Sequence, residues 1–391
     1  MRSSGKSIDQ KIAIFGESGS GKTVLTASFY GSMQQEEFHK HSLLWASADS
    51  ASDNGSLMHT YLEMKEDAVA PPYTRFNFKS YGFTFKPSNG GIGKGGQPAG
   101  LLRLVWDDYP GEWFEQDPSS ATEEQRRIES FKTLVTSDVA FILVDGQKLI
   151  DYEGEEERYF KKIFTDMSQA LLKAEDQILE GGKPLVRFPR IWVLALSKAD
   201  LHPNLDVHGF RNLAIKKAAS GIDDFRKIIE RYVESPEALS VCEDFLLLSS
   251  AKFTPGKIDV STRTGVDLIL PLAALLPLQH ALQWQEKKTA NKRVMKVLLE
   301  ASGSLVLALG FMQKWLKKGK GKGGAKAAAA IGALLAASAL IEFTTEQAKD
   351  RLEAMMKDAV ERGSFFEAVI ARFAYDLAEA EEKGILLRSR R

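Results

Sequence analysis

Short apolar runs alternate with longer charged stretches over the first two thirds of the chain. Several of these runs have the length and continuity of strands buried inside a sheet, namely 11–15, 101–106, 138–146, 189–196 and 244–248. The stretches between them predict helices over 24–30, 123–135, 150–180 and 206–233. Alternation of this kind predicts an α/β fold with a mostly parallel sheet between helices.

A period-two pattern over residues 75–85 differs from the continuous apolar runs and predicts a strand with one buried face. The glycine-rich residues 88–100 follow it and predict a flexible connection to the next apolar run. We therefore expect residues 75–106 to form a hairpin with a long loop. The preceding residues 31–70 are polar, with weak helical spacing over 57–66.

The character of the sequence changes after Gly265. Residues 266–282 are strongly apolar and are expected to close the first domain. Apolar side chains at helical spacing over 344–381 predict packed helices further on. The sequence thus divides into an α/β domain over 8–275 and an all-α C-terminal region over 276–391.

Two apolar segments inside the C-terminal region, 298–312 and 327–341, allow two interpretations. Lysines stand among glycines between them, at Lys314, Lys317, Lys318, Lys320, Lys322 and Lys326. A hairpin over 298–341 with this basic tip could touch acidic lipid head groups. Alternatively, the hairpin packs on the helices that follow, since fifteen residues rise ~22 Å against a ~30 Å hydrocarbon core.

The charge balance is zero, with 52 Lys and Arg against 52 Asp and Glu among 391 residues. This balance argues against a broad nucleic-acid-binding surface, so no nucleic-acid partner is expected. Cys242 is the only cysteine, which suits a reducing cytosol, and residues 1–10 are polar without an apolar signal core. We expect a cytoplasmic protein that meets a membrane only if the 298–341 hairpin does.

The chemistry of the chain centres on residues 16–23, which fit the phosphate-loop pattern G-x-x-x-x-G-K-[ST]. A predicted strand precedes the loop and a predicted helix follows it. Its backbone N–H groups would point at phosphate oxygens near the positive end of the helix dipole. Lys22 would reach the β- and γ-phosphates and Thr23 would hold Mg²⁺. The expected nucleotide contacts are Gly16, Glu17, Ser18, Gly19, Ser20, Gly21, Lys22, Thr23 and Val24.

A second phosphate-side element follows the strand at 101–106. The motif Asp108-x-x-Gly111 is short, and it is informative only because it follows a phosphate loop and a strand. A carboxylate here typically holds Mg²⁺ through water, and the glycine N–H can bond the γ-phosphate. Asp108 is therefore an expected metal ligand, and Gly111 an expected phosphate contact.

Base recognition is expected at Ser197-Lys198-Ala199-Asp200, which is close to the guanine-reading pattern [NT]-K-x-D. The Asp200 carboxylate would accept two hydrogen bonds from guanine, while the stem of Lys198 packs along the base. Adenine offers neither donor there, so its binding would leave a carboxylate unpaired at a cost of ~1–3 kcal/mol. Ser197 replaces the usual Asn or Thr, and its hydroxyl can still tie this loop to the phosphate loop.

A short element after the strand at 244–248 completes the set, because Ser250, Ala251 and Lys252 resemble the S-A-K element that contacts the base. These motifs, in this order, resemble the translation-factor-related (TRAFAC) class of GTPases over roughly residues 8–275. Within that class, Asp108-Tyr109-Pro110-Gly111-Glu112-Trp113 is similar to the signature of YcjX-like bacterial GTPases. The resemblance implies a P-loop NTPase fold with a Ras-like G domain, with GTP or GDP and Mg²⁺ as ligands.

The resemblance also implies a threonine that senses the γ-phosphate through Mg²⁺. Thr74 is the first choice and Thr84 the second. Glu112 stands where many small GTPases carry a glutamine that orients the attacking water. Because a carboxylate there would repel the γ-phosphate, hydrolysis is expected to be slow, at ~10⁻⁴–10⁻² s⁻¹ without a partner. Glu112, Lys22 and Thr74 are thus the expected catalytic residues, with Trp113 as a packing anchor beside them.

The sequence therefore predicts a GTPase that works as a nucleotide-dependent switch and transmits its state to the C-terminal helices. A protein effector or an activating partner is expected, since no arginine stands out as a finger supplied in cis. Two alternatives remain at this point. One is a P-loop ATPase or phosphotransferase, and the other is a tethering or remodelling protein whose membrane contact GTP controls.

Overall fold

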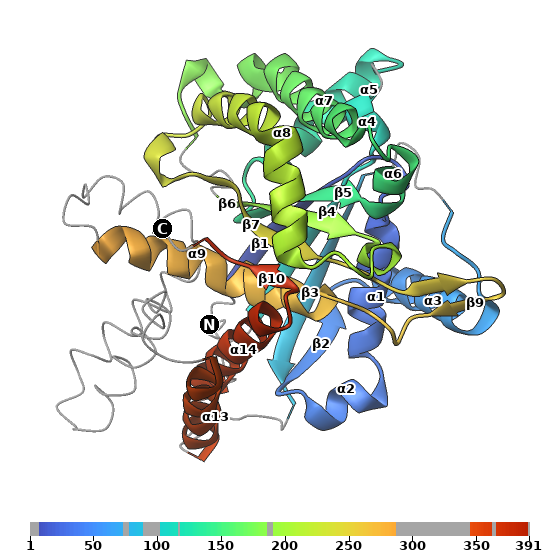
Figure 1. Ribbon diagram of the computed structural model, residues 1–391, viewed down its shortest axis with the longest axis vertical. Helices are drawn as coiled ribbons and strands as arrows, with labels where there is room; N and C mark the ends of the chain where they lie inside the picture. Colours follow the sequence, from blue (N-terminus) through green and yellow to red (C-terminus); the bar gives the residue numbers. More distant parts are fainter. Residues whose placement is uncertain are drawn as a thin grey trace, which may run out of the picture.

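The computed structural model of the protein describes residues 8–72, 78–88, 102–115, 118–185, 191–286, 345–361 and 365–389. Figure 1 shows a central sheet with helices on both faces and further helices at the C-terminal end. The expected fold class, α/β with a mostly parallel sheet between helices, is confirmed.

The described residues form an eight-stranded sheet in the order β10-β7-β6-β5-β1-β4-β3-β2. Its strands are β1 Ile8–Phe15, β2 Leu44–Ala48, β3 Lys79–Pro87, β4 Leu102–Asp108, β5 Val139–Asp145, β6 Ile191–Ser197, β7 Ser240–Leu247 and β10 Leu386–Leu387. The five central strands, from β7 to β4, are mutually parallel, whereas β10, β3 and β2 each pair antiparallel with their neighbour. A separate hairpin consists of β8 Lys252–Thr254 and β9 Lys257–Asp259.

Helices connect the parallel strands and cover both faces of the sheet (Figure 1). They are α1 Lys22–Met33, α2 Glu36–His41, α3 Ala51–Asp67, α4 Glu112–Glu115, α5 Ala121–Leu134, α6 Gly146–Asp151, α7 Glu156–Ile178, α8 Val207–Glu230, α9 Ile269–Glu286, α13 Thr345–Glu361 and α14 Phe365–Glu382. Short 3₁₀ turns lie at Glu180–Gly182, Ala199–Leu201, Pro236–Ala238 and Val266–Leu268.

The central strands are apolar throughout because both of their faces are buried. In β1, Ile12 and Ile14 join the core beneath α1, α3, α9 and α14, whereas Ala13 and Phe15 join the core beneath α7 and α8. Every residue of β5 and β6 is buried. Since successive side chains of a strand point to opposite faces, a continuous apolar run is what a covered parallel strand requires.

The predicted hairpin is confirmed in its described part, where β3 and β4 pair antiparallel with Lys79 opposite Asp108. Most of the predicted glycine-rich connection lies outside the described residues. The helix expected over 150–180 is confirmed as α7, but it begins at Glu156 and not at residue 150, because a break separates α6 from α7. Gly154, with φ 84°, lies in the break between them, and this left-handed conformation favours glycine.

The polar stretch 31–70 contains more structure than its sequence suggested, including the edge strand β2. The outer edge of β2 is covered by side chains from the end of α1. Gln34 donates to the Ala46 carbonyl at 3.0 Å, and the Ala48 N–H donates to the Tyr30 hydroxyl at 3.2 Å. A strand of five residues with one half-exposed tryptophan, Trp45, gives too short a pattern to be recognised.

The C-terminal helices pack on the rest of the chain. α14 contacts both α13 and α9, and β10 adds the last strand to the sheet beside β7. The segments 298–312 and 327–341, with the lysines between them, lie outside the described residues. Within the described part of the chain, no helix has both the length and the apolar character needed to cross a membrane. The division into 8–275 and 276–391 stays a prediction.

Candidate functional site

The motifs singled out in the sequence meet at one edge of the sheet. The phosphate loop follows β1, Asp108 ends β4, Ser197 ends β6, and residues 249–252 follow β7. Because β1, β4, β6 and β7 run parallel, these positions lie together at the carboxyl edge. This edge is where open α/β sheets bind ligands.

The phosphate loop has the backbone conformation that its glycines permit. Gly19 and Gly21 have φ of 83° and 89°, and Gly21 is the N-cap of α1. At Gly16, an added Cβ would lie 2.5 Å from the Ser20 hydroxyl. The Lys22 ammonium is buried and donates to the carbonyls of Gly16 at 2.6 Å and Glu17 at 2.9 Å. The Lys22 side chain thus lies inside the phosphate loop, where it is predicted to contact the β- and γ-phosphates.

Glu17 fixes the loop to two helices. Its buried carboxylate accepts hydrogen bonds from Lys148 of α6, at 2.7 Å, and from Lys162 of α7. Burial alone would raise the pKa of Glu17, but the two lysines outweigh it and lower that pKa. Lys148 and Lys162 follow Glu17 by 131 and 145 positions, so no local pattern could have revealed these contacts.

Asp108 lies beside the phosphate loop and receives a hydrogen bond from the Thr23 hydroxyl. Burial raises the pKa of Asp108 to about 6, although Lys22 and Thr23 act in the opposite direction. Its Oδ1 atom is buried without a hydrogen-bond partner among the described residues. A hydroxyl beside a carboxylate with one unpartnered oxygen fits a Mg²⁺ ion that keeps several waters. Within the described ranges, no group of three or more His, Cys, Asp or Glu side chains could hold a metal ion.

The segment after Asp108 closes over the loop. An added Cβ at Gly111 would lie 2.1 Å from the backbone nitrogen of Ser18, so glycine is required for this approach. The Ser18 hydroxyl donates to Glu112 Oε1 at 2.8 Å. Both glycine and glutamate of this segment are therefore in direct contact with the phosphate loop.

Aromatic side chains hold this closing segment in place. Trp113 is buried and stacks on Phe78 with ring centroids 6.5 Å apart, and it meets the edge of Phe131 at the same distance. The Arg127 guanidinium lies 6.0 Å from the Trp113 ring centroid and donates to the Trp113 carbonyl. These contacts support the expected role of Trp113 as a packing anchor.

A pocket of about 270 Å³ opens beside the start of α1. Its walls come from four separated parts of the chain: the phosphate-loop end with the start of α1, the end of β5 with the start of α6, the end of β6 with the 3₁₀ turn after it, and the segment after β7. The residues lining it are Ser20, Gly21, Val24, Leu25, Leu143, Gln147, Ser197, Lys198, Asp200, Leu201, Leu248, Ser250, Ala251 and Phe253. The structure thus brings the phosphate loop and the predicted base-reading residues to one cavity.

Two contacts arrange the predicted base-reading residues within this pocket. Lys198 has φ 52° and its ammonium pairs with Asp145 at 2.8 Å. The Ser249 hydroxyl donates to Asp200 Oδ1 at 2.7 Å, and no partner for Oδ2 is seen among the described residues. Ser249 was missed by the sequence reasoning, which favoured the neighbouring Ser250.

Some expectations do not match the geometry. The Ser197 hydroxyl donates to the Val144 carbonyl at 3.2 Å, so it ties its loop to β5 and not to the phosphate loop. Lys252 is exposed and is absent from the pocket lining. Thr84, the second choice for the sensing threonine, is opposite Arg103 near the far end of β4, and it donates to Asp49. Thr74, the first choice, lies outside the described residues.

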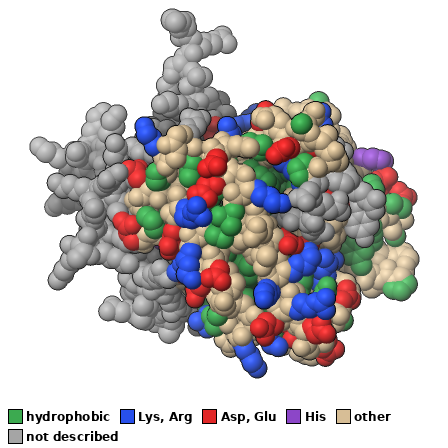
Figure 2. Space-filling view, turned by 90° about the horizontal axis from the view of Figure 1, so that it is seen from above, with side chains coloured by type: hydrophobic (Ala, Val, Ile, Leu, Met, Phe, Trp, Pro, Cys, Tyr) green, Lys and Arg blue, Asp and Glu red, His purple; other side chains and the backbone are tan. Residues whose placement is uncertain are grey.

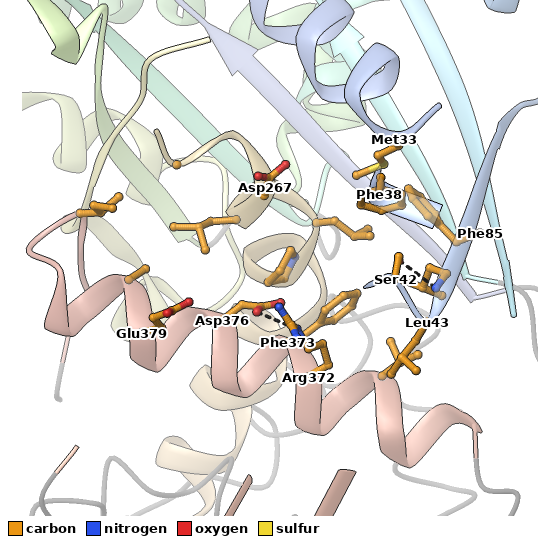
Figure 3. A pocket seen from close by; sticks show the side chains of 18 of the residues that line it. Met33, Phe38, Ser42, Leu43, Phe85, Asp267, Arg372, Phe373, Asp376 and Glu379 are labelled. Carbon is orange, nitrogen blue, oxygen red and sulfur yellow. Dashed lines mark hydrogen bonds and ion pairs between the residues drawn. The ribbon is translucent and has the colours of Figure 1, made fainter. Parts of the chain in front are cut away.

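A second cavity, of about 360 Å³, lies at the opposite end of α1 (Figure 3). Met33 from the end of α1, Phe85 of β3 and Phe373 of α14 line it. Arg372 and Asp376 of α14 form an ion pair of 2.9 Å at its wall. The C-terminal helix and the helix that begins at the phosphate loop therefore share one cavity.

No family model and no curated protein matches this chain. Among solved structures, the chain is similar to the Roco2 RocCORdC structure of Methanosarcina barkeri bound to GDP. The two share 11% sequence identity over 98% of this chain and 93% of that chain, with a TM-score of 0.25. A TM-score this low does not indicate a function, so the function of this chain is inferred from its own geometry.

Proposed function

We propose that the protein binds guanine nucleotides with Mg²⁺, hydrolyses GTP slowly and works as a nucleotide-dependent switch of the TRAFAC class. The observation that carries this proposal is the single pocket shared by the phosphate loop, Lys198 and Asp200. Phosphate binding and guanine reading need these groups within the length of one nucleotide. Residues 108–113 contact the phosphate loop through Gly111 and Glu112. Their similarity to the YcjX-like signature supports a YcjX-like member of the class.

In this proposal, Thr23 and Asp108 hold the metal ion, which neutralises charge on the phosphate oxygens when it is bound. The loop N–H groups and Lys22 bind the phosphates after Lys22 leaves the carbonyls of Gly16 and Glu17. Glu112 lies beside the loop and can accept a proton from an attacking water. Its negative charge also disfavours the γ-phosphate, which supports a slow intrinsic reaction.

Asp200 recognises guanine in this proposal. Its Oδ1 atom already accepts a hydrogen bond from the Ser249 hydroxyl. This hydrogen bond orients the carboxylate toward the pocket and leaves Oδ2 for a base. Ala251 is buried and lines the same pocket next to Ser250.

Transmission to the C-terminal helices has two structural supports. Ser249 pairs with Thr264 through two backbone hydrogen bonds of 2.9 and 2.8 Å, and Thr264 precedes the turn that opens α9. α14 packs on α9 and also faces the end of α1 across the second cavity.

Figure 2 shows acidic and basic side chains interspersed on one face of the molecule, which fits a protein partner better than a nucleic acid.

The nucleotide released from the purified protein on denaturation tests this proposal. The released material is separated by ion-exchange chromatography and compared with GDP, GTP, ADP and ATP standards. We expect GDP or GTP close to one equivalent per chain. Adenine nucleotide in that amount would instead support the ATPase or phosphotransferase alternative.

A further inference from the structure

We propose that Phe253 stacks on the purine ring and so supplies binding energy that does not depend on which base is bound. This inference rests on the proposed function and adds a residue that no sequence motif indicated. Phe253 lies in β8, two residues after the predicted S-A-K contact Ala251, and it lines the base pocket.

The exposure of Phe253 is the first argument. Phe253 is 49% exposed, and Leu201, the last residue of the 3₁₀ turn that contains Asp200, is 39% exposed. Two of the eight large apolar side chains that the described residues expose therefore line this one pocket. Leu201 follows Asp200 directly, and Phe253 lies two residues after Ala251, so both are close in sequence to the predicted base-reading groups. Apolar surface left open at a pocket mouth favours a flat, apolar ligand surface that would cover it.

The rigidity of the arm that carries Phe253 is the second argument. Phe253 pairs with Ile258, and cross-strand partners point to the same face of a hairpin. Ile258 is buried in the core, and β9 packs against α3. Gly256, with φ 72°, makes the turn, which Thr254 closes by donating to the Lys257 carbonyl at 3.1 Å. The ring is thus presented from an anchored hairpin.

Stacking would contribute affinity for the base, and hydrogen bonding would determine which base is preferred. Every purine has an aromatic face, so stacking is tolerant of base identity. Asp200 would distinguish guanine from adenine, whereas Phe253 would strengthen binding of both. The pairing of Lys198 with Asp145 keeps the lysine stem at the same pocket, on which the other face of the base can pack.

Affinity measurements on Phe253 variants test this inference. GDP and inosine diphosphate, which lacks the 2-amino group, are titrated by calorimetry into the full chain and into Phe253→Ala, Phe253→Leu and Phe253→Tyr. We expect Phe253→Ala to weaken both nucleotides about 5- to 150-fold, with their affinity ratio unchanged. Phe253→Tyr should retain affinity because it keeps the ring, and Phe253→Leu should not restore it.

Ile215→Ala is the matched control, because Ile215 is 43% exposed on α8 and does not line the pocket. It should bind GDP as the unsubstituted chain does. If the unsubstituted chain binds GDP and Phe253→Ala binds it within twofold, the stacking role is overturned while the proposed function stands. Failure of the unsubstituted chain to bind GDP would overturn the proposed function and this inference together.

Discussion

The candidate site has a phosphate side, formed by the phosphate loop and residues 108–113, and a base side, formed by the pocket that Lys198 and Asp200 line. The two sides differ in how many of their polar groups are already hydrogen-bonded. On the phosphate side, the protein's own groups satisfy one another, with Lys22 on loop carbonyls, Ser18 on Glu112 and Gly111 against the loop backbone. On the base side there is an open pocket of about 270 Å³, with one oxygen of Asp200 available. A base could enter without rearrangement, whereas a γ-phosphate must displace existing contacts.

This difference indicates where a switch can be built. A base side that is already open would give affinity that is common to GDP and GTP. Contacts that must break on the phosphate side would make GTP binding depend on the movement of residues 108–113. A ligand shifts a conformational equilibrium only by its differential affinity for the two states. Substitutions on the two sides should therefore separate affinity from discrimination between GTP and GDP.

The largest expected effect comes from Lys22→Ala. The buried ammonium is the positively charged group of the phosphate loop, so its loss should weaken GDP binding about 100-fold, equivalent to about 3 kcal/mol. Calorimetric titration with GDP and Mg²⁺ measures this change. Lys227→Ala, at an exposed ion pair with Asp224, is the control and should have no effect. Unchanged affinity in Lys22→Ala would remove the phosphate-loop assignment.

Asp200→Asn should have the next largest effect and acts on the base side. Asparagine offers an N–H group where guanine also donates, so GDP affinity should fall by about 10- to 100-fold. Xanthosine diphosphate, which has a carbonyl in place of the 2-amino group, should gain affinity. Competition of both nucleotides against a fluorescent GDP analogue measures the exchange. Equal losses for both nucleotides would mean that Asp200 does not read the base.

Glu17→Gln tests how firmly the phosphate loop is fixed to α6 and α7. Lys148 and Lys162 are partly exposed, so water screens the pairs, and we expect a loss of about 1–2 kcal/mol in the free energy of unfolding at pH 7. Because the folded-state pKa of Glu17 is lowered, its contribution is present above the ordinary value of 4.5 and is lost as pH falls below it.

Urea unfolding at pH 7 and at several values below pH 4.5 measures this dependence. The difference between Glu17→Gln and the unsubstituted chain should shrink toward the acid end. A difference that stays constant with pH would show that the carboxylate charge does not stabilise the loop.

Ser18→Ala should have the smallest effect, and it should be confined to the phosphate side. Loss of the hydrogen bond to Glu112 removes one contact that a γ-phosphate must break. Affinity for a non-hydrolysable GTP analogue should rise about fivefold relative to GDP, equivalent to about 1 kcal/mol. Parallel titrations with the two nucleotides measure the ratio. A ratio equal to that of the unsubstituted chain would contradict a closed phosphate side.

The sequence predicted those parts of the fold and site in which adjacent residues act together. Continuous apolar runs identified β1, β5 and β6 because both faces of those strands are buried. The phosphate loop was recognised because its glycines, Lys22 and Thr23 are contiguous. The short strand β2 escaped notice because α1 side chains, and not its own pattern, complete its edge.

Contacts between distant residues could not be predicted in this way. Lys148 and Lys162 reach Glu17 from helices more than a hundred residues away. Either of two adjacent serines could have faced Asp200, and the backbone after β7 selects Ser249. Phe253 carries no motif, and its place at the pocket depends on pairing with Ile258 and on the packing of β9 against α3.

The central claim is that one nucleotide spans both sides of this site and is read as guanine. Competition of GDP and ADP for the nucleotide-free full chain, in the presence of Mg²⁺, tests it most directly. We predict that GDP binds at least about tenfold more tightly, because the adenine of ADP offers no donor to the Asp200 Oδ2 atom. Equal affinity for GDP and ADP would contradict the account.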